Sequence, residues 1–304
     1  MMYGCAVRRR GNRETDMKKT LSLRVLLLVL IMSMGMPAGS AFAAERSKKI
    51  KNGYDEEGNF YDSKGYKIQK STILHLLETA IEPVGRTMYI WGGGHAGKEQ
   101  TMIGVSPQWE KFFKKQNKNY DYRNTRFQYR NGLDCSGYVG WVLYNTFHTE
   151  SGQGSCTYLA QDMTRIYSGW GWGSYKSARK FKKHKAGDIM SLAAGHVYIV
   201  IGRCTDGSVV LVHSSPQGVM INGTVSSKGK KKSKAWKLAR QYMKKYFPKW
   251  MKKYKDVSRG SSYLKNYSRM SWYIGKKNSV MTDPEGLRNK NASQVLKILF
   301  RNRS

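Results

Sequence analysis

Three side chains of this protein could together perform nucleophilic catalysis: Cys135, His196 and His213. A thiolate that attacks an amide needs a base, which takes the thiol proton and later returns it to the leaving amine. That base in turn needs a third group to hold its ring. His196 and His213 can fill these two positions. Taken singly, each residue also has an ordinary explanation, since free cysteine and histidine are often simply buried or partly buried.

The residues around Cys135 predict a helix that begins beside the thiol. Asp134 is a good N-cap. The residues that follow recur at the spacing of one buried helical face: Val139, Val142, Leu143 and Thr146. Unpaired backbone N–H groups and the helix dipole favour a thiolate in the first helical turn. We therefore expect Cys135 to have a lowered pKa.

The two histidines lie at the ends of apolar, β-branched runs. Residues 196 to 202 and 209 to 213 predict the strands of an antiparallel hairpin. An even-length turn without a bulge would place both histidines on one face of neighbouring strands. A two-residue turn at Asp206-Gly207 would set the second histidine opposite Val200, so contact with the first needs a shifted register or a bulge. Gly195, just before the first strand, leaves room for substrate.

Composition divides the chain into segments. We predict a secretory signal peptide in 1–43, an N-terminal arm or hairpin in 44–70, a core in 71–225 with an insertion at 94–132, and a basic helical C-terminal extension in 226–304. The signal is indicated by Lys18, Lys19 and Arg24 before an apolar run, and by Ala41 and Ala43 at the cleavage positions. No later apolar stretch approaches the roughly 20 residues of a membrane span. We expect a secreted monomer, either extracellular or associated with the cell wall.

Further elements are predicted from the spacing of apolar residues and from the residues that begin or end helices and strands. They are helices over 71–81, 108–113, 157–167 and 293–300, a short strand at 88–91 leading into Gly92-Gly93-Gly94, and strands at 187–192 and 217–221.

The formal net charge of +34 predicts attraction to polyanions. The basic segment 228–255 has apolar residues at helical spacing, so it could lie on anionic wall polymers. Alternatively it is a surface helix that packs its apolar face on the domain and exposes its lysines, and we favour this second interpretation. Binding to DNA would follow from charge alone, so we expect no specific nucleic-acid partner.

Cysteine spacing predicts neither a disulfide framework nor a metal site. Beyond the signal, Cys135, Cys156 and Cys204 remain, and an odd number leaves at least one thiol unpaired. Cys156 and Cys204 could form a disulfide, but without a dense framework we expect core residues. No close Cys-x-x-Cys or His-x-x-x-His pair is present, which disfavours zinc, and we expect no cofactor.

Several short motifs occur in the same order along the chain as in a known family of enzymes. They are Tyr89-x-Trp91-Gly92-Gly93, Asp134-Cys135-Ser136-Gly137, Gly187-Asp188, Gly195-His196-Val197 and His213-Ser214-Ser215. On these motifs, residues 71 to 222 resemble the NlpC/p60 family of cell-wall cysteine peptidases. The chain departs from that family in its long insertion, in the wide spacing of its histidines and in its basic extension.

The resemblance implies an α+β, papain-like fold, with a nucleophile-bearing helix packed on an antiparallel sheet. It makes Cys135 the nucleophile, His196 the general base and acid, and His213 the group that orients His196. Tyr89, Trp91 and Ser136 would contact substrate, and Tyr89 with the Cys135 backbone N–H would hold the oxyanion.

The function that the resemblance implies is hydrolysis of amide bonds in peptidoglycan stem peptides, commonly after γ-linked D-glutamate. One alternative is a CHAP-type amidase, which also pairs an early cysteine with a Gly-His-Val strand. Another is a catalytically inactive, cationic wall-binding protein that grips anionic wall polymers through residues 228–255.

Overall fold

The computed structural model describes residues 60–61, 67–68, 70–96, 102–147, 156–181, 183–277 and 279–303. The predicted signal peptide, and most of the predicted arm, lie outside these residues. Within the arm, β1 (Phe60–Tyr61) pairs antiparallel with β2 (Lys67–Ile68).

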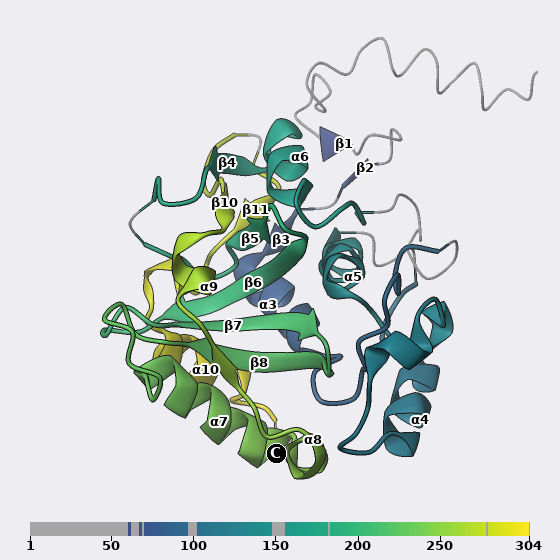
Figure 1. Cartoon of the computed structure of the whole chain (residues 1–304). Coiled ribbons are helices and arrows are strands. Elements are labelled where there is room, and N and C mark those ends of the chain that lie inside the picture. Colours follow the sequence, from purple (N-terminus) through teal and green to yellow (C-terminus); the bar gives the residue numbers. More distant parts are fainter. Residues whose placement is uncertain are drawn as a thin grey trace, which may run out of the picture. The chain divides into compact units, whose positions relative to one another are not determined.

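A seven-stranded sheet forms the centre of the fold, in the order β4-β10-β5-β6-β7-β8-β9 (Figure 1). All neighbours pair antiparallel except β8 and β9, which are parallel. The strands are β4 (Gly173–Lys176), β5 (Ile189–Leu192), β6 (His196–Arg203), β7 (Val209–Ser215), β8 (Gly218–Thr224), β9 (Ser258–Arg259) and β10 (Ser268–Trp272). A parallel pair of β3 (Ser71–Thr72) and β11 (Met281–Thr282) lies apart from this sheet.

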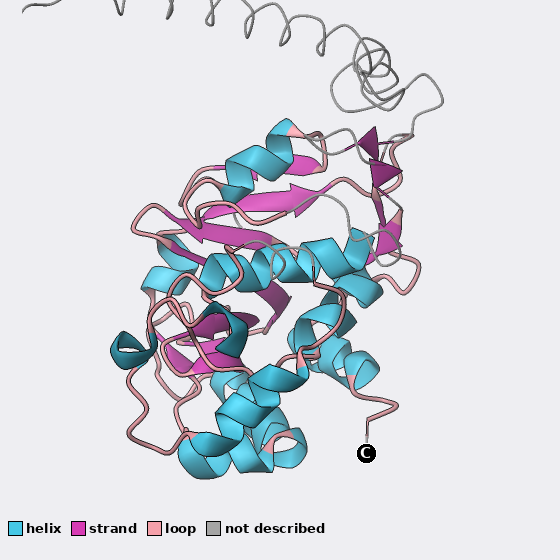
Figure 2. Cartoon of the chain, turned by 90° about the vertical axis from the view of Figure 1, so that its right-hand side faces the viewer, coloured by secondary structure: helices cyan, strands magenta, loops and turns pink. Residues whose placement is uncertain are grey.

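Helices accompany the sheet, and helical turns and loops of the insertion lie in front of the strands in Figure 2. The α-helices are α3 (Ile73–Ile81), α4 (Pro107–Lys115), α5 (Cys135–Phe147), α6 (Met163–Gly169), α7 (Lys234–Tyr246), α8 (Pro248–Lys253), α9 (Ser262–Lys265) and α10 (Ala292–Leu299). Short 3₁₀ turns are η2 (Tyr122–Thr125), η3 (Tyr129–Asn131) and η4 (Leu287–Asn289). The chain is thus of mixed α and β structure with a mostly antiparallel sheet, as an α+β fold requires.

The core lies on both faces of β6. On one face Val197 and Ile199 join the main apolar cluster, which includes residues of α3, α5, α7 and α10. On the other face Tyr198 and Val200 join a smaller cluster that includes Tyr267. Helix α5 is buried along its whole length, because it packs against α3 on one side and β6 and β7 on another. The first turn of α5 is therefore fixed relative to the start of β6.

The C-terminal segment corrects the prediction of a helical extension. Residues 226–304 do contain helices, but they also supply β9 and β10 to the central sheet, where β10 lies between β4 and β5. Trp272 of β10 stacks on Trp172 at 5.7 Å and donates a hydrogen bond to the Gly187 carbonyl at 2.7 Å. Hydrophobic periodicity could not reveal this, because strand pairing across some 80 residues leaves no local pattern.

Helix α7 lies in the basic segment and packs on β8. Its buried residues are Ala235, Ala239 and Met243, while most of its lysines are exposed. A Cβ atom on Gly223 of β8 would lie 2.3 Å from the main chain of Ala235, so helix and strand are in close contact. This is the arrangement that the favoured interpretation of the segment expects.

Two local predictions were wrong in extent. The helix expected over 157–167 begins only at Met163, because Ala160, Gln161 and Asp162 form a turn before it. The strand expected at 88–91 is reduced to isolated bridges from Met88 to Gly132 and Gly218. Within the described ranges, no helix is long and apolar enough to cross a membrane.

Candidate active site

Asp134 fixes the start of the helix that carries Cys135. Its Oδ1 accepts the Gly137 N–H at 2.7 Å, the bond expected of an N-cap, and Oδ2 accepts the Gly92 N–H at 3.1 Å. One carboxylate therefore holds both the first turn of α5 and the glycine turn that follows Trp91. Cys135 is the first residue of α5 and is 5% exposed.

The β6–β7 hairpin brings the histidines together through its turn length and a bulge, neither of which the sequence determined. The Cys204 N–H donates to the Ser208 carbonyl at 2.8 Å, so the turn has three residues rather than two. An odd-length turn alone would put the histidines on opposite faces. The register also shifts between Val200 and Gly202, and the extra residue, Ile201, forms a bulge that restores the shared face.

As a result, His196 Nε2 lies 2.8 Å from His213 Nδ1. On its other side, His213 Nε2 lies 2.6 Å from Asn222 Oδ1 on β8. If Asn222 Oδ1 accepts the His213 Nε2–H, then His213 Nδ1 accepts the His196 Nε2–H. This assignment leaves His196 Nδ1 without hydrogen, which is the state a general base needs.

Arg259 is a site residue that the sequence did not indicate. It lies on β9, with its side chain 13% exposed and its Nε 3.3 Å from His213 Nε2. The guanidinium donates hydrogen bonds to Ser215 Oγ at 2.8 Å and to the Ser258 carbonyl at 2.7 Å. Because Asn222 Oδ1 is nearer to Nε2 than Arg259 is, we assign the Nε2 hydrogen to the Asn222 bond. Arg259 then acts on the ring mainly through its charge.

Burial, and after it the charge of Arg259, lowers the pKa of both histidines. The pKa of His196 falls to about 3, although the nearby Asp134 carboxylate opposes the shift, and that of His213 falls well below its usual value. Both rings are therefore neutral at pH 7. His196 therefore has an unprotonated ring nitrogen, although the burial that keeps it neutral also lowers its affinity for a proton.

The thiol environment contradicts the expected lowered pKa. Burial, and then the Asp134 carboxylate, raises the pKa of Cys135 to about 12. The backbone N–H groups of Val197, Ser136 and Cys135 itself lower the pKa, but by less. The helix terminus does act as expected, yet desolvation outweighs it. Thiol and imidazole are both neutral at rest, so the proton must move when the thiol attacks.

This resting state predicts the pH dependence of alkylation at Cys135. The rate with iodoacetamide should rise about tenfold per pH unit from pH 7 to 10, because the thiolate remains the minor form throughout. Asp134→Asn keeps a capping oxygen but removes the charge, so its Cys135 should react faster at each pH. Peptide mass spectrometry separates Cys135 from the other cysteines.

The matched control for this experiment is Asp162→Asn, which alters the aspartate at the start of α6, where no side-chain capping bond is made. Its alkylation profile at Cys135 should match the wild type. A wild-type rate that levels off by pH 8 would contradict the raised pKa.

The Cys135 Sγ atom lies against the main chain on both sides of His196. It is 3.8 Å from the Gly195 carbonyl oxygen, and the Val197 N–H is among the groups that act on its pKa. The thiol therefore lies where β6 begins. The structure thus places the Cys135 thiol beside the main chain that flanks His196, and the His196 ring beside that of His213.

The three expected substrate residues occupy different environments. Tyr89 is 7% exposed, and burial, followed by the neighbouring Cys135, raises its pKa well above the usual value. Trp91 is 46% exposed. The Ser136 hydroxyl is buried, donating to Asp134 Oδ1 at 3.0 Å and lying 2.9 Å from His95 Nε2. Ser136 therefore helps to build the start of α5 and is directed at protein groups.

Two tyrosines around α9 pack over the histidines and were also missed. The Tyr263 ring lies 5.7 Å from His196 and 5.8 Å from His213, and the Tyr267 ring lies 6.2 Å from His196. Both tyrosines belong to the segment that the sequence assigned to an extension. The four-residue spacing of the two tyrosines could have indicated that they lie on one face of a helical turn. It could not have indicated that this face packs over the histidine rings.

The described residues hold no group of three or more His, Cys, Asp or Glu side chains that could bind a metal ion. Cys156 and Cys204 are both buried in the core, and no disulfide joins them to each other. A scan of the sequence against protein-family models finds no match, and a search of curated proteins finds no similar sequence.

Proposed function

We propose that the protein is a secreted cysteine peptidase that hydrolyses amide bonds in peptidoglycan stem peptides, with the bond after γ-linked D-glutamate as the expected point of cleavage. One observation carries the chemistry. A cysteine at the start of a buried helix lies against the main chain of His196, whose ring is hydrogen-bonded to His213 at 2.8 Å. The substrate class comes from the NlpC/p60 resemblance, which also implies a papain-like arrangement of α5 on the antiparallel sheet.

The reaction begins when His196 Nδ1 takes the thiol proton as Sγ attacks the carbonyl carbon. The resulting imidazolium is stabilised through its Nε2–H bond to His213, and the Cys135 backbone N–H and the Tyr89 hydroxyl are the candidate donors to the oxyanion. The intermediate then collapses to a thioester, and the amine leaves with the proton held by His196. Water, deprotonated by His196, hydrolyses the thioester and restores the thiol.

The experiment is digestion of purified peptidoglycan and soluble muropeptides, with products identified by mass spectrometry. Cys135→Ala should produce no fragments. Cys204→Ala is the matched control, because it removes a buried thiol just past the far end of β6 from His196. It should yield the wild-type fragments.

The fragment masses identify the bond. Cleavage between sugar and peptide would replace the proposal with a CHAP-type amidase. Intact muropeptides that sediment with the protein would replace it with a wall-binding function. Equal digestion by Cys135→Ala and the wild type would refute the cysteine mechanism.

A further inference from the structure

A row of aromatic rings leads from the thiol to the surface. Tyr122 and buried Tyr89 meet in a T-shaped contact with their ring centroids 5.3 Å apart, and Trp91 stacks on Tyr122 at 6.4 Å. Tyr89 is close enough to Cys135 for the thiol to influence its pKa, after the larger effect of burial. At the other end, Trp91 is 46% exposed. The row thus begins in the candidate active site and ends in solvent.

Phe127 lies beside the outer end of this row in an unusual conformation. Its side chain is 59% exposed and its φ is 62°, in the left-handed region that residues other than glycine seldom adopt. Its N–H donates to the Trp91 carbonyl at 3.0 Å. A Cβ atom on Gly92 would lie 3.3 Å from the Phe127 ring and 3.0 Å from that of Tyr129. Residues held in such sparsely populated backbone conformations cluster at ligand-binding and active sites.

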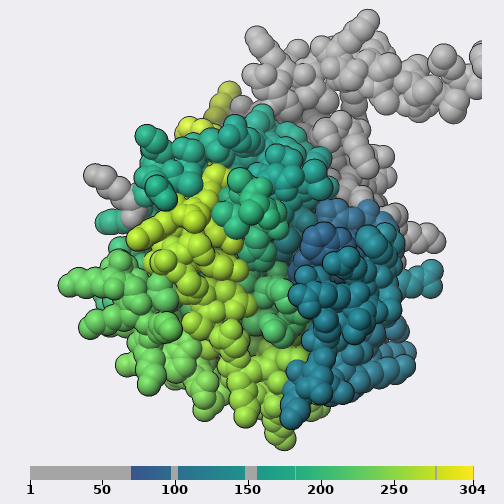
Figure 3. Space-filling view, viewed as in Figure 1, coloured from purple at the N-terminus to yellow at the C-terminus, as the bar shows by residue number. Residues whose placement is uncertain are grey.

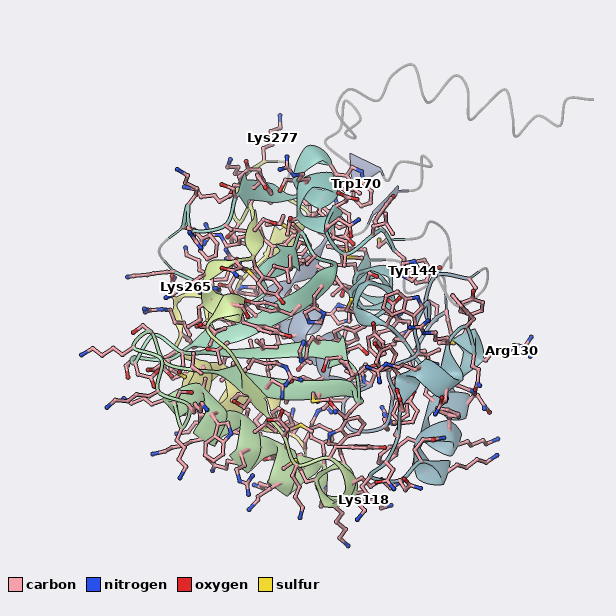
Figure 4. All side chains as sticks on the ribbon, viewed as in Figure 1. Lys118, Arg130, Tyr144, Trp170, Lys265 and Lys277 are labelled. Carbon is pink, nitrogen blue, oxygen red and sulfur yellow. The ribbon has the colours of Figure 1, made fainter. Side chains whose placement is uncertain are left out.

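Positive charge accompanies the rings. The Arg126 guanidinium lies 5.6 Å from the Trp91 ring centroid, and that of Arg123 lies 5.8 Å from Tyr122. A cavity of about 930 Å³ opens alongside and is lined in part by Phe127, Tyr129 and Arg130. Figure 4 shows Arg130 at the outer edge of the insertion, on the opposite side of the molecule from Lys265 of α9. The aromatic surface is defined here as Trp91, Tyr122, Arg126, Phe127 and Tyr129.

We propose that the aromatic surface binds the sugar portion of the substrate, namely the amino-sugar ring to which the stem peptide is attached. This inference rests on the proposed function and assigns a role to the insertion. The flat, apolar faces of a pyranose ring fit against exposed aromatic rings, while guanidinium and phenol groups donate hydrogen bonds to its hydroxyl, amide and carboxyl oxygens.

The spacing of the rings suits this occupant. The ring centroids are 5.3 Å apart between Tyr89 and Tyr122 and 6.4 Å apart between Tyr122 and Trp91. The Trp91 ring therefore lies no farther from Tyr89 than the sum of these two distances, which three to four extended residues can span at roughly 3.4 Å each. For cleavage after γ-linked D-glutamate, two amino acids and a lactyl group separate the cut bond from the sugar ring. A peptide with its reacting carbonyl at Cys135 would therefore place the sugar near Trp91. Figure 3 shows the blue-teal insertion on the surface beside the yellow-green C-terminal segment.

The test measures binding in a Cys135→Ala background, so that it does not depend on hydrolysis. The ligands are a disaccharide-tetrapeptide and the same tetrapeptide without sugar, titrated by calorimetry. We expect the sugar to tighten binding about tenfold or more. Phe127→Ala and Trp91→Ala should each reduce this advantage by roughly five- to tenfold, the effect of losing one stacked ring.

The control is Leu159→Ala. Leu159 is also a large exposed apolar residue, at 61%, but it lies before α6 and outside the insertion. This variant should retain the full sugar advantage.

Equal affinity for the two ligands would overturn the inference while leaving the proposed function to the digestion experiment. At a salt concentration that suppresses the general attraction of this basic chain for DNA, competition by single-stranded DNA that exceeds competition by the free disaccharide would also overturn it, because bases stack on such rings too. If the wild type cuts no muropeptide and the sugar still tightens binding, the inference holds and the proposed function fails.

Discussion

Replacement of His196 with glutamine is expected to lower kcat/KM for soluble muropeptides by about a hundred- to ten-thousandfold, the usual contribution of a general base. Glutamine retains polar atoms near His213 but cannot accept the thiol proton. Because burial raises the Cys135 pKa to about 12, the thiol does not ionise unaided at neutral pH. The loss should therefore persist across pH 6 to 8. Initial rates measured by chromatography of the products check this.

His184→Gln is the matched control for that variant. His184 is also a histidine whose pKa burial lowers, to about 4, and its ring packs against Phe181 at 5.0 Å. It belongs to the loop before β5, and none of its ring contacts reaches the proposed catalytic residues. The control should retain near wild-type kcat/KM. If kcat/KM of His196→Gln lies within about threefold of the wild-type value, His196 is not the general base.

Gly137→Ala is expected to reduce the free energy of unfolding by roughly 3 kcal/mol, at the upper end of the cost of overpacking. A Cβ atom on Gly137 would lie 1.9 Å from the Gly93 carbonyl oxygen and 2.8 Å from the Gly94 Cα. Both neighbours are main-chain atoms, so no side-chain rotation relieves the clash. The first turn of α5 would move away from the glycine turn and carry Cys135 with it.

Urea denaturation compares this variant with Gly169→Ala. Gly169 is also a helical glycine, but a Cβ atom there meets no atom within 4 Å. Alanine should be neutral or stabilise α6 by up to about 1 kcal/mol. Equal unfolding midpoints for the two variants would show that the approach of α5 to the glycine turn does not limit stability.

The sequence alone predicted the parts of the site that depend on neighbouring residues. The N-cap at Asp134 and the helical spacing after Cys135 predicted α5, and its first residue is the cysteine. Runs rich in β-branched residues predicted β6 and β7, with a histidine in each. Such features follow from backbone propensity and from capping within one turn, which act over a few residues.

Tertiary structure decided how these parts meet. Whether His196 touches His213 depended on a three-residue turn and a bulge at Ile201, and neither has a local signature strong enough to fix the register. Arg259 reaches His213 from 46 residues further along the chain. The sign of the Cys135 pKa shift followed from burial, which only the packed fold determines.

The sequence therefore determined which residues could do the chemistry and on which elements they lie. The packed chain determined their distances, their protonation and the unexpected partners around them. The physical reason is range: capping and strand propensity are local, whereas register, desolvation and charge proximity depend on residues that come together only after the sheet has formed.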